Sequence, residues 1–112
     1  MKKKEFYVYQ EDLIRYRVKY EKVTITQLVE DLNAMFSQED MKRLRTEIIT
    51  NYLTTNGYLT ITDSDKKRPT FKGKLLGIDV GVITDKTGRE VEVNLYNEKA
   101  QNYILDNLYE MI

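Results

Sequence analysis

Residues 37–59 constrain the fold most, because they carry the start and stop signals of one long helix followed by a strand. Ser37 can cap the first free amides, and Asp40 completes a capping-box-like pair that also suits the positive end of a helix dipole. Asn56-Gly57 ends the helical pattern, since glycine accepts the left-handed conformation that a helix terminus favours. We therefore expect a helix that begins near Gln38 and a strand that follows the glycine. The buried stripe of this helix would consist of Met41, Leu44, Ile48, Ile49, Tyr52 and Leu53.

Two shorter segments precede this helix. Residues 12–20 fit two patterns, because apolar and basic side chains alternate as in a half-buried strand, while other spacings suit a helix. We favour a helix, since a break and the short β-branched stretch at residues 23–25 follow it. Residues 26–33 then predict a short amphipathic helix capped by Thr24 or Thr26. Its buried face would consist of Leu28, Leu32 and Met35 or Phe36.

A first hairpin is expected after the long helix. Residues 63–69 are dense in turn formers and charge, which predicts a surface loop between a strand at residues 58–62 and a second strand near Thr70. Gly73 and Gly77 then bracket either a tight turn or a single helical turn.

The last third of the chain predicts a second hairpin and a final helix. Strands at residues 78–84 and 89–96 flank a clear turn at residues 85–88 and should pair with each other. Asn97 can cap a helix over residues 98–111. The buried stripe of that helix would consist of Ala100, Ile104, Leu108 and Met111, with Leu105 and Ile112 beside it.

Composition limits the chemistry that such a chain can perform. With 112 residues, the chain predicts a single α+β domain that can bury a core without disulfides or metal. Cysteine and histidine are absent, which excludes thiol chemistry and the two commonest zinc ligands. No glycine-rich phosphate loop is present either, so we expect no enzyme, no catalytic residue, no metal and no cofactor. The basic residues 2–4 are followed by no long apolar run, so we expect no signal peptide, no membrane partner and a cytoplasmic location.

The order of helix, short strand, helix, long helix and hairpin resembles a winged helix-turn-helix domain. Two stretches carry the resemblance: L-I-R-Y-R-V-K-Y-E-K-V-T-I-T-Q-L-V-E-D-L-N at residues 13–33 and I-I-T-N-Y-L-T-T-N-G-Y-L-T-I at residues 48–61. The resemblance implies a winged-helix-like core over residues 12–76, with an added C-terminal β-hairpin and helix over residues 77–112. The connection at residues 33–38 is longer than is usual at the corner of this motif.

The resemblance also implies contacts with double-stranded DNA. The third helix of such domains lies in the major groove, and the hairpin, called the wing, touches the backbone or the minor groove. Carried onto this chain, the helix positions are Lys42, Arg43 and Arg45, and the wing positions are Lys66, Lys67 and Arg68.

The local charge of the wing supports this interpretation. The chain has 18 basic and 18 acidic residues, so no global field attracts nucleic acid. Residues 66–74 nevertheless carry five cations and no acidic residue: Lys66, Lys67, Arg68, Lys72 and Lys74. Such a patch can neutralise phosphates. We therefore predict a small nucleic-acid-binding protein, a DNA-binding regulator or an accessory factor of DNA processing, whose helix and wing cations meet one duplex.

Two other surfaces offer alternatives. Arg15, Arg17 and Lys19 alternate with Tyr16 and Tyr20, which is typical of single-strand binders but also of the solvated face of a helix. The C-terminal part is acidic instead, with Glu90, Glu92, Glu98, Asp106 and Glu110. It suggests a protein-interaction module without nucleic-acid binding, in which residues 98–112 contact a partner or form a homodimer through Tyr103, Leu105, Tyr109 and Ile112.

Overall fold

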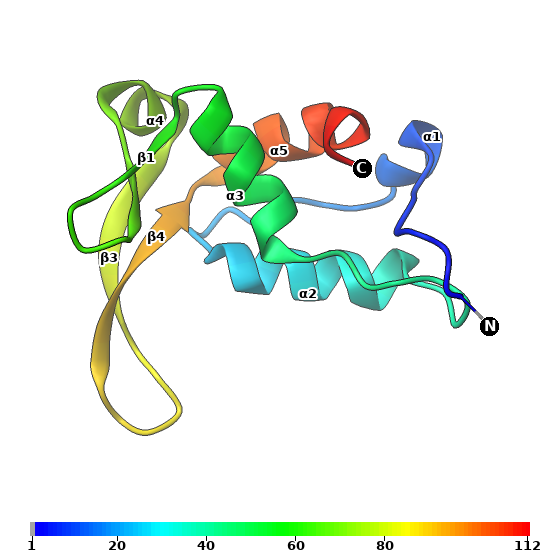
Figure 1. Ribbon diagram of the computed structural model, residues 1–112, viewed down its shortest axis with the longest axis horizontal. Helices are drawn as coiled ribbons and strands as arrows, with labels where there is room; N and C mark the ends of the chain where they lie inside the picture. Colours follow the sequence, from blue (N-terminus) through cyan, green and yellow to red (C-terminus); the bar gives the residue numbers. More distant parts are fainter. Residues whose placement is uncertain (1) are drawn as a thin grey trace.

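The computed structural model describes residues 2–112 and, over that range, combines five helices with two small antiparallel sheets. The α+β class is therefore confirmed (Figure 1). The elements in chain order are α1 (Gln10–Leu13), α2 (Ile25–Phe36), α3 (Thr46–Thr55), β1 (Leu59–Ile61), β2 (Lys67–Pro69), α4 (Phe71–Leu76), β3 (Ile78–Thr84), β4 (Glu90–Tyr96) and α5 (Glu98–Met111).

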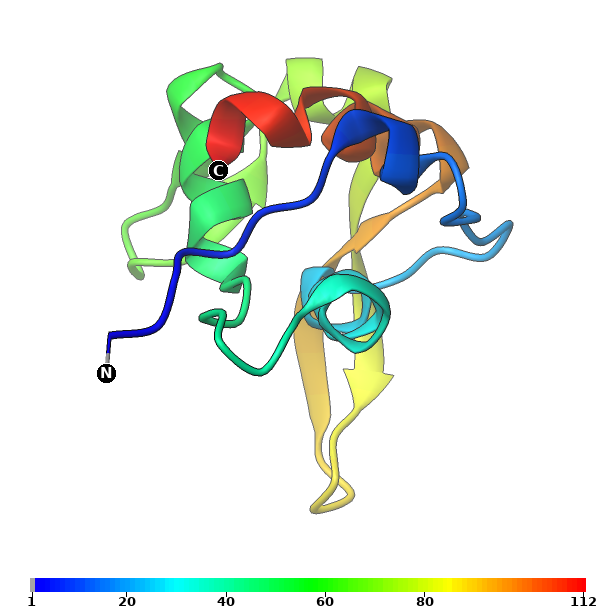
Figure 2. The same ribbon diagram turned by 90° about the vertical axis from the view of Figure 1, so that its right-hand side faces the viewer.

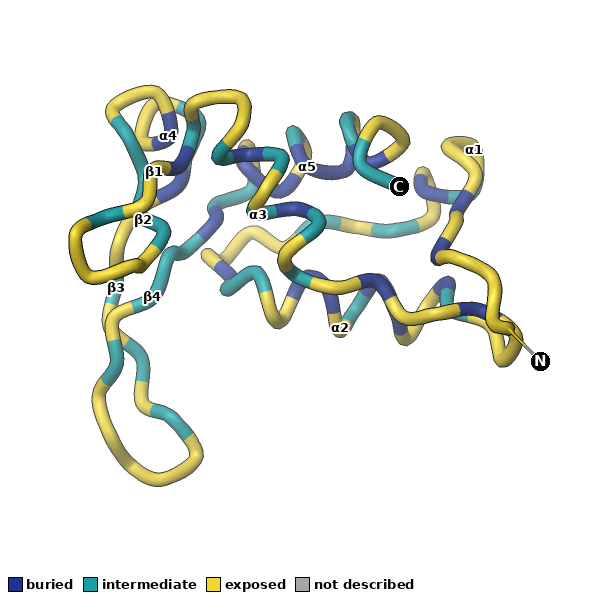
Figure 3. The backbone as a smooth tube through the Cα atoms, viewed as in Figure 1, coloured by how far each residue is buried: buried dark blue, intermediate teal, exposed yellow. Residues whose placement is uncertain are grey.

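The core lies where the apolar faces of α2, α3 and α5 meet. Leu32, Ile49 and Ile104, one from each helix, are completely buried. Figure 3 shows buried residues concentrated on these three helices, whereas the far end of the β3–β4 hairpin is exposed or only partly buried. That end projects beyond α2 (Figure 2). The buried stripe predicted for the second helix is confirmed, with Phe36 buried and Met35 exposed. The stripe predicted for the last helix is buried from Ala100 to Leu108, whereas Met111 and Ile112 are only partly buried.

Side-chain caps fix the starts of α2 and α5. The Gln27 backbone N–H donates to Thr24 Oγ1 (3.1 Å), and the Thr24 N–H donates to Gln27 Oε1 (3.0 Å), so that Thr24 closes a capping box. The Ala100 N–H donates to Asn97 Oδ1 (2.9 Å). The predicted cap of the last helix is confirmed, and of the two candidates for the earlier helix the cap is Thr24.

The predicted long helix is wrong in its first half, because α3 begins only at Thr46. The buried side chain of Asn33 donates to Leu44 O (2.9 Å) and accepts from Leu44 N–H (2.7 Å), which holds this backbone extended. Next to it, Lys42 N–H donates to Lys4 O (2.6 Å). The backbone N–H groups of Lys42 and Leu44 therefore donate to partners far away in the chain, and not to the carbonyl four residues earlier as in a helix. The predicted end is confirmed, since α3 stops at Thr55, two residues before a left-handed glycine.

The predicted first helix is also wrong beyond α1, because the chain is irregular from residue 14 to 22. Gln101 of α5 is completely buried and fastens this segment. Its side-chain oxygen accepts from Lys19 N–H (3.0 Å), and its nitrogen donates to Lys19 O (3.1 Å), Glu21 O (3.2 Å) and Tyr96 O (3.1 Å). A side chain about eighty residues away therefore takes the place of local helical hydrogen bonds.

Two hairpins form as predicted, but the second strand of the first hairpin is not near Thr70. β2 lies at Lys67–Pro69, inside the predicted loop, because the Thr70 side chain caps α4 and ends the strand there. β1 pairs with β2 from Leu59 opposite Pro69 to Ile61 opposite Lys67, and β3 pairs with β4 along their whole lengths. The segment at residues 73–77, predicted as a tight turn or a single helical turn, belongs to the short helix α4. Gly77 ends this helix in the left-handed conformation, with φ 115°. A bridge between Val23 and Tyr96 attaches the second hairpin to the start of α2.

We expect Gln101→Leu to lower the free energy of unfolding by about 2–4 kcal/mol, because it leaves several backbone groups without their partner in a buried site. Urea unfolding followed by circular dichroism measures this change. Asn102→Leu, the exposed neighbour on α5, is the matched control and should change stability by less than about 0.5 kcal/mol. Equal effects of the two variants would contradict the role given to Gln101.

The Tyr96 hydroxyl is buried without a hydrogen-bond partner among residues 2–112, and burial raises the pKa of this residue from 10.0 to about 12. We therefore expect Tyr96→Phe to be neutral or stabilising by about 1 kcal/mol at neutral pH. In the native protein, stability should fall between pH 10 and 12, since the unfolded chain releases the phenolic proton first. The Phe variant should lose about 2 kcal/mol less over that range. Urea titrations at several pH values test this, with the exposed Tyr20→Phe as control.

Candidate nucleic-acid interface

The structure divides the eight cations predicted to contact nucleic acid into three groups. Lys66, Arg68 and Lys74 line one hollow between β2, α4 and the β3–β4 hairpin. Lys67 and Lys72 contact α3 and the residue that follows it. The remaining three, which are Lys42, Arg43 and Arg45, lie in the extended segment before α3.

The first group surrounds a cavity of about 480 Å³, which we call the hairpin hollow. Its lining residues are Thr62, Ser64, Lys66, Arg68, Pro69, Lys74, Val80 and Glu92. Successive side chains of a strand point to opposite faces, so Arg68 faces the hollow while Lys67 turns toward α3. α4 follows β2 and adds Lys74 to the lining, so Arg68 and Lys74, which are six residues apart in the sequence, line the same hollow.

The cations of the hollow differ in how far other groups neutralise them. The side chains of Lys66 and Lys74 make no hydrogen bond or ion pair within residues 2–112. Arg68 is only 20 % exposed and donates to Lys67 O (3.0 Å) and Asn94 Oδ1 (3.4 Å), so it joins the two hairpins. Glu92, the one carboxylate in the lining, lies 3.9 Å from Arg68 and is largely exposed. The pair is long and its carboxylate is open to water, which weakens the attraction, and the three cations outnumber the one carboxylate in the lining.

The second group binds within the protein. The Lys67 ammonium donates to Asn51 Oδ1 (2.6 Å) and Thr50 Oγ1 (3.0 Å) of α3. The Lys72 ammonium donates to Asn56 O (2.8 Å) and lies 4.4 Å from the centre of the Tyr58 ring. These two lysines therefore fasten β2 and α4 to the α3 end of the fold.

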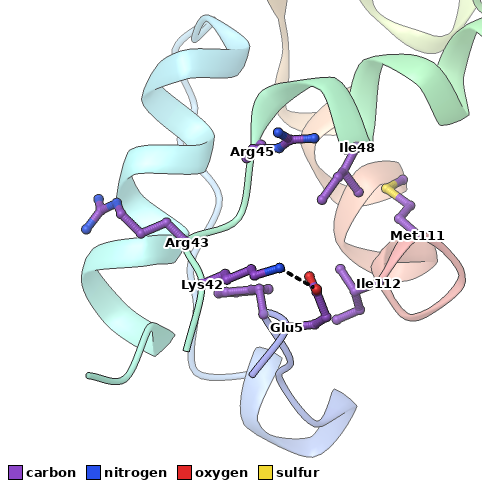
Figure 4. Close-up of a pocket in the computed structure, with 8 residues that line it drawn as sticks. Glu5, Lys42, Arg43, Arg45, Ile48, Met111 and Ile112 are labelled. Atoms are coloured by element: carbon purple, nitrogen blue, oxygen red, sulfur yellow. Dashed lines mark hydrogen bonds and ion pairs between the residues drawn. The ribbon is translucent and has the colours of Figure 1, made fainter. Parts of the chain in front are cut away.

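The third group lines a different pocket, of about 400 Å³, together with Phe6, Ile48 and the C-terminal residues (Figure 4). Lys42 Nζ lies 2.9 Å from Glu5 Oε1, and Arg45 Nε lies 3.5 Å from Glu47 Oε2. Arg43 points away from the pocket, toward α2 (Figure 4). The prediction that these three cations project from the third helix is wrong, because that helix starts after them.

α3 itself carries no lysine or arginine. Its exposed residues include Glu47, Asn51 and Thr55. On another flank, Tyr52 Oη donates to Glu110 Oε2 of α5 (2.6 Å), and this hydrogen bond is the main cause that raises the pKa of Tyr52. The helix therefore offers polar but not cationic groups to a ligand.

The two alternative surfaces are partly used by the fold. Lys19 pairs with Asp31 (3.3 Å), and burial, together with Asp31, raises the pKa of Tyr16 to about 12. Of the apolar residues predicted for a contact through α5, Tyr103 packs against Tyr58 with ring centres 4.9 Å apart, and Leu105 is buried. Tyr109 stays exposed.

Phe71 is a surface feature that the sequence analysis missed. It is 78 % exposed at the start of α4, and Leu75, one turn later, is also exposed. The spacing could have revealed it, because residues four apart share a helix face and Gly73 lies on the opposite, buried side.

Within residues 2–112, no three acidic, histidine or cysteine side chains gather in a way that could hold a metal ion. Over the same residues, none of the helices has the length and apolar character needed to cross a bilayer. Comparison with protein-family models, curated proteins and solved structures finds no match.

Proposed function

We propose that this protein binds nucleic acid through the hairpin hollow, as a small winged-helix-like regulator or accessory factor of DNA processing. The observation that carries the proposal is that Lys66 and Lys74, which have no side-chain partner within residues 2–112, line a hollow that Arg68 also lines. The hydroxyls of Thr62 and Ser64 lie in the same lining and are hydrogen-bonded to each other (3.1 Å), so one hydroxyl proton of the pair remains for a ligand. Cations and hydroxyls together suit the oxygens of a phosphate group.

The order of the elements supports the winged-helix part of the proposal. α2 and α3 precede the β1–β2 hairpin directly, and α3 contacts both α2 and β1. The β1–β2 hairpin would be the wing of such a domain. The cations concentrate there and not on α3, so the proposed contacts are with the phosphate backbone and not with base edges in the major groove.

A neutral protein can bind in this way because phosphate contacts are local. Each phosphate that the protein neutralises releases counterions, which favours binding at low salt. For each such phosphate, a tenfold rise in salt concentration therefore lowers the logarithm of the binding constant by about 0.7–0.9. The charge pattern therefore predicts weak, salt-sensitive association that does not depend on base sequence.

We expect the double variant Lys66→Ala/Lys74→Ala to weaken binding and to make the salt dependence shallower by about 1.5, because two phosphate contacts are lost. Fluorescence anisotropy with labelled single-stranded and duplex DNA of random sequence, titrated at several salt concentrations, gives both quantities. Lys22→Ala/Lys86→Ala removes the same charge from exposed positions outside the hollow and should leave the slope unchanged. Absence of binding at low salt, or the same loss in both double variants, would refute the proposal.

Glu92→Gln should have the opposite effect. It removes the one carboxylate in the lining of the hollow and its ion pair with Arg68, so we expect affinity for DNA to rise by about 2- to 5-fold at low salt. Glu90→Gln, two residues along the same strand and outside the hollow, is matched in charge and should have a smaller effect. Equal gains in the two variants would mean that net charge alone decides binding, which would contradict a site at the hollow.

A further inference from the structure

We infer that the ligand of the hairpin hollow is a single strand of nucleic acid, with one unstacked base lying on the ring of Phe71. This inference rests on the proposed function and specifies its substrate class. It combines an exposed aromatic ring, a rigid support for that ring, and unpaired cations beside it.

The ring of Phe71 is held in the solvent by a well-fixed backbone. Thr70 caps α4, since its Oγ1 accepts from Gly73 N–H (3.1 Å) and its hydroxyl donates to Gly57 O (2.6 Å). The backbone of Gly73 lies so close to the Tyr58 carbonyl that no side chain would fit between them. α4 therefore cannot rotate to bury Phe71, and its backbone has little conformational entropy to lose when a ligand contacts the ring.

Phe71 is not in the lining of the hollow, but lining residues lie on both sides of it in the chain. Pro69, which lines the hollow, is two residues before Phe71, and Lys74 is three residues after it. Side chains three apart on a helix have Cβ atoms about 5–6 Å apart, so a base on the ring would keep its phosphate within reach of Lys74. Cations beside an exposed aromatic ring are the arrangement that single-strand binders use.

The charge around the ring favours an anionic partner. From residue 66 to residue 78 the chain carries five cations and no acidic residue, and Lys72 and Lys74 follow Phe71 on α4. A duplex keeps its bases paired and stacked, so the ring would gain nothing from it beyond backbone contacts. An open strand offers the face of a base, and stacking then adds to the phosphate contacts.

Phe71→Trp tests the stacking directly, because the chain contains no other tryptophan. We expect its fluorescence to be quenched on addition of a short oligothymidylate, and to change much less on addition of duplex DNA at the same nucleotide concentration. Tyr20→Trp is the matched control, since Tyr20 is 93 % exposed and lies outside the hollow. Its fluorescence should not respond to either ligand.

Phe71→Ala provides the second measurement. We expect it to lower the affinity for the oligothymidylate by about 5- to 150-fold, the loss that corresponds to one stacked base, and to leave duplex binding nearly unchanged. Ile14→Ala, which shortens another exposed apolar side chain outside the hollow, should change neither affinity. Thermal unfolding of both variants should match that of the native protein, since neither side chain is buried.

The outcomes separate this inference from the proposed function. If Phe71→Ala binds the oligonucleotide as well as the native protein does, while Lys66→Ala/Lys74→Ala still weakens binding, the single-strand inference is wrong and the phosphate site stands. If neither form of DNA binds at low salt, both are wrong. If the free protein dimerises and Phe71→Ala makes it monomeric in sedimentation, the ring belongs to a protein contact and the inference is overturned.

Discussion

Two buried side-chain amides hold together the parts of this fold that have no regular structure. Gln101 fixes the segment at residues 14–22 against α5, and Asn33 fixes the segment before α3 against α2. Both amides satisfy backbone groups that would otherwise be buried without partners, and each such group costs about 1–3 kcal/mol. Because these segments lie against the helices of the core, the packing of α2, α3 and α5 depends on them.

These amides also explain where the sequence predicts the structure and where it does not. Caps, glycine stops and alternating strands act over a few residues, so the bounds of β3 and α5 follow from local signals. Residues 38–45 have a good helical pattern as well, and Met41 and Leu44 are buried as that pattern requires. Their backbone is not helical, because a turn at residues 39–40 is followed by a segment for which Asn33 and Lys4 supply partners from elsewhere in the chain. No local pattern reports such a partner.

The candidate site, like the fold, could be predicted where local signals decide it but not where distant partners do. The run of cations at residues 66–74 is visible in the sequence, but which cations are neutralised depends on residues that lie far away in the chain. Lys67 meets Asn51, whereas Lys66 meets no partner in the described part of the chain. Glu92 and Val80 enter the hollow from the second hairpin, which the resemblance treats as an addition to the core. Charge patterning therefore found the cationic region but could not separate the cations that have partners within the protein from those that have none among residues 2–112.

The difference between cations with internal partners and cations without them affects how the proposed site could bind a ligand. Arg68, Lys67 and Lys72 bind within the protein, so they keep β2 and α4 in place whether or not a ligand is present. Lys66, Lys74 and Phe71, whose side chains make no hydrogen bond or ion pair within residues 2–112, project from this frame. A ligand that contacts them does not have to break internal bonds, and the backbone of the frame loses little conformational freedom on binding. The residues that hold β2 and α4 in place are thus different from the residues that project toward a ligand. The projecting side chains can therefore be mutated without removing the contacts that hold the frame.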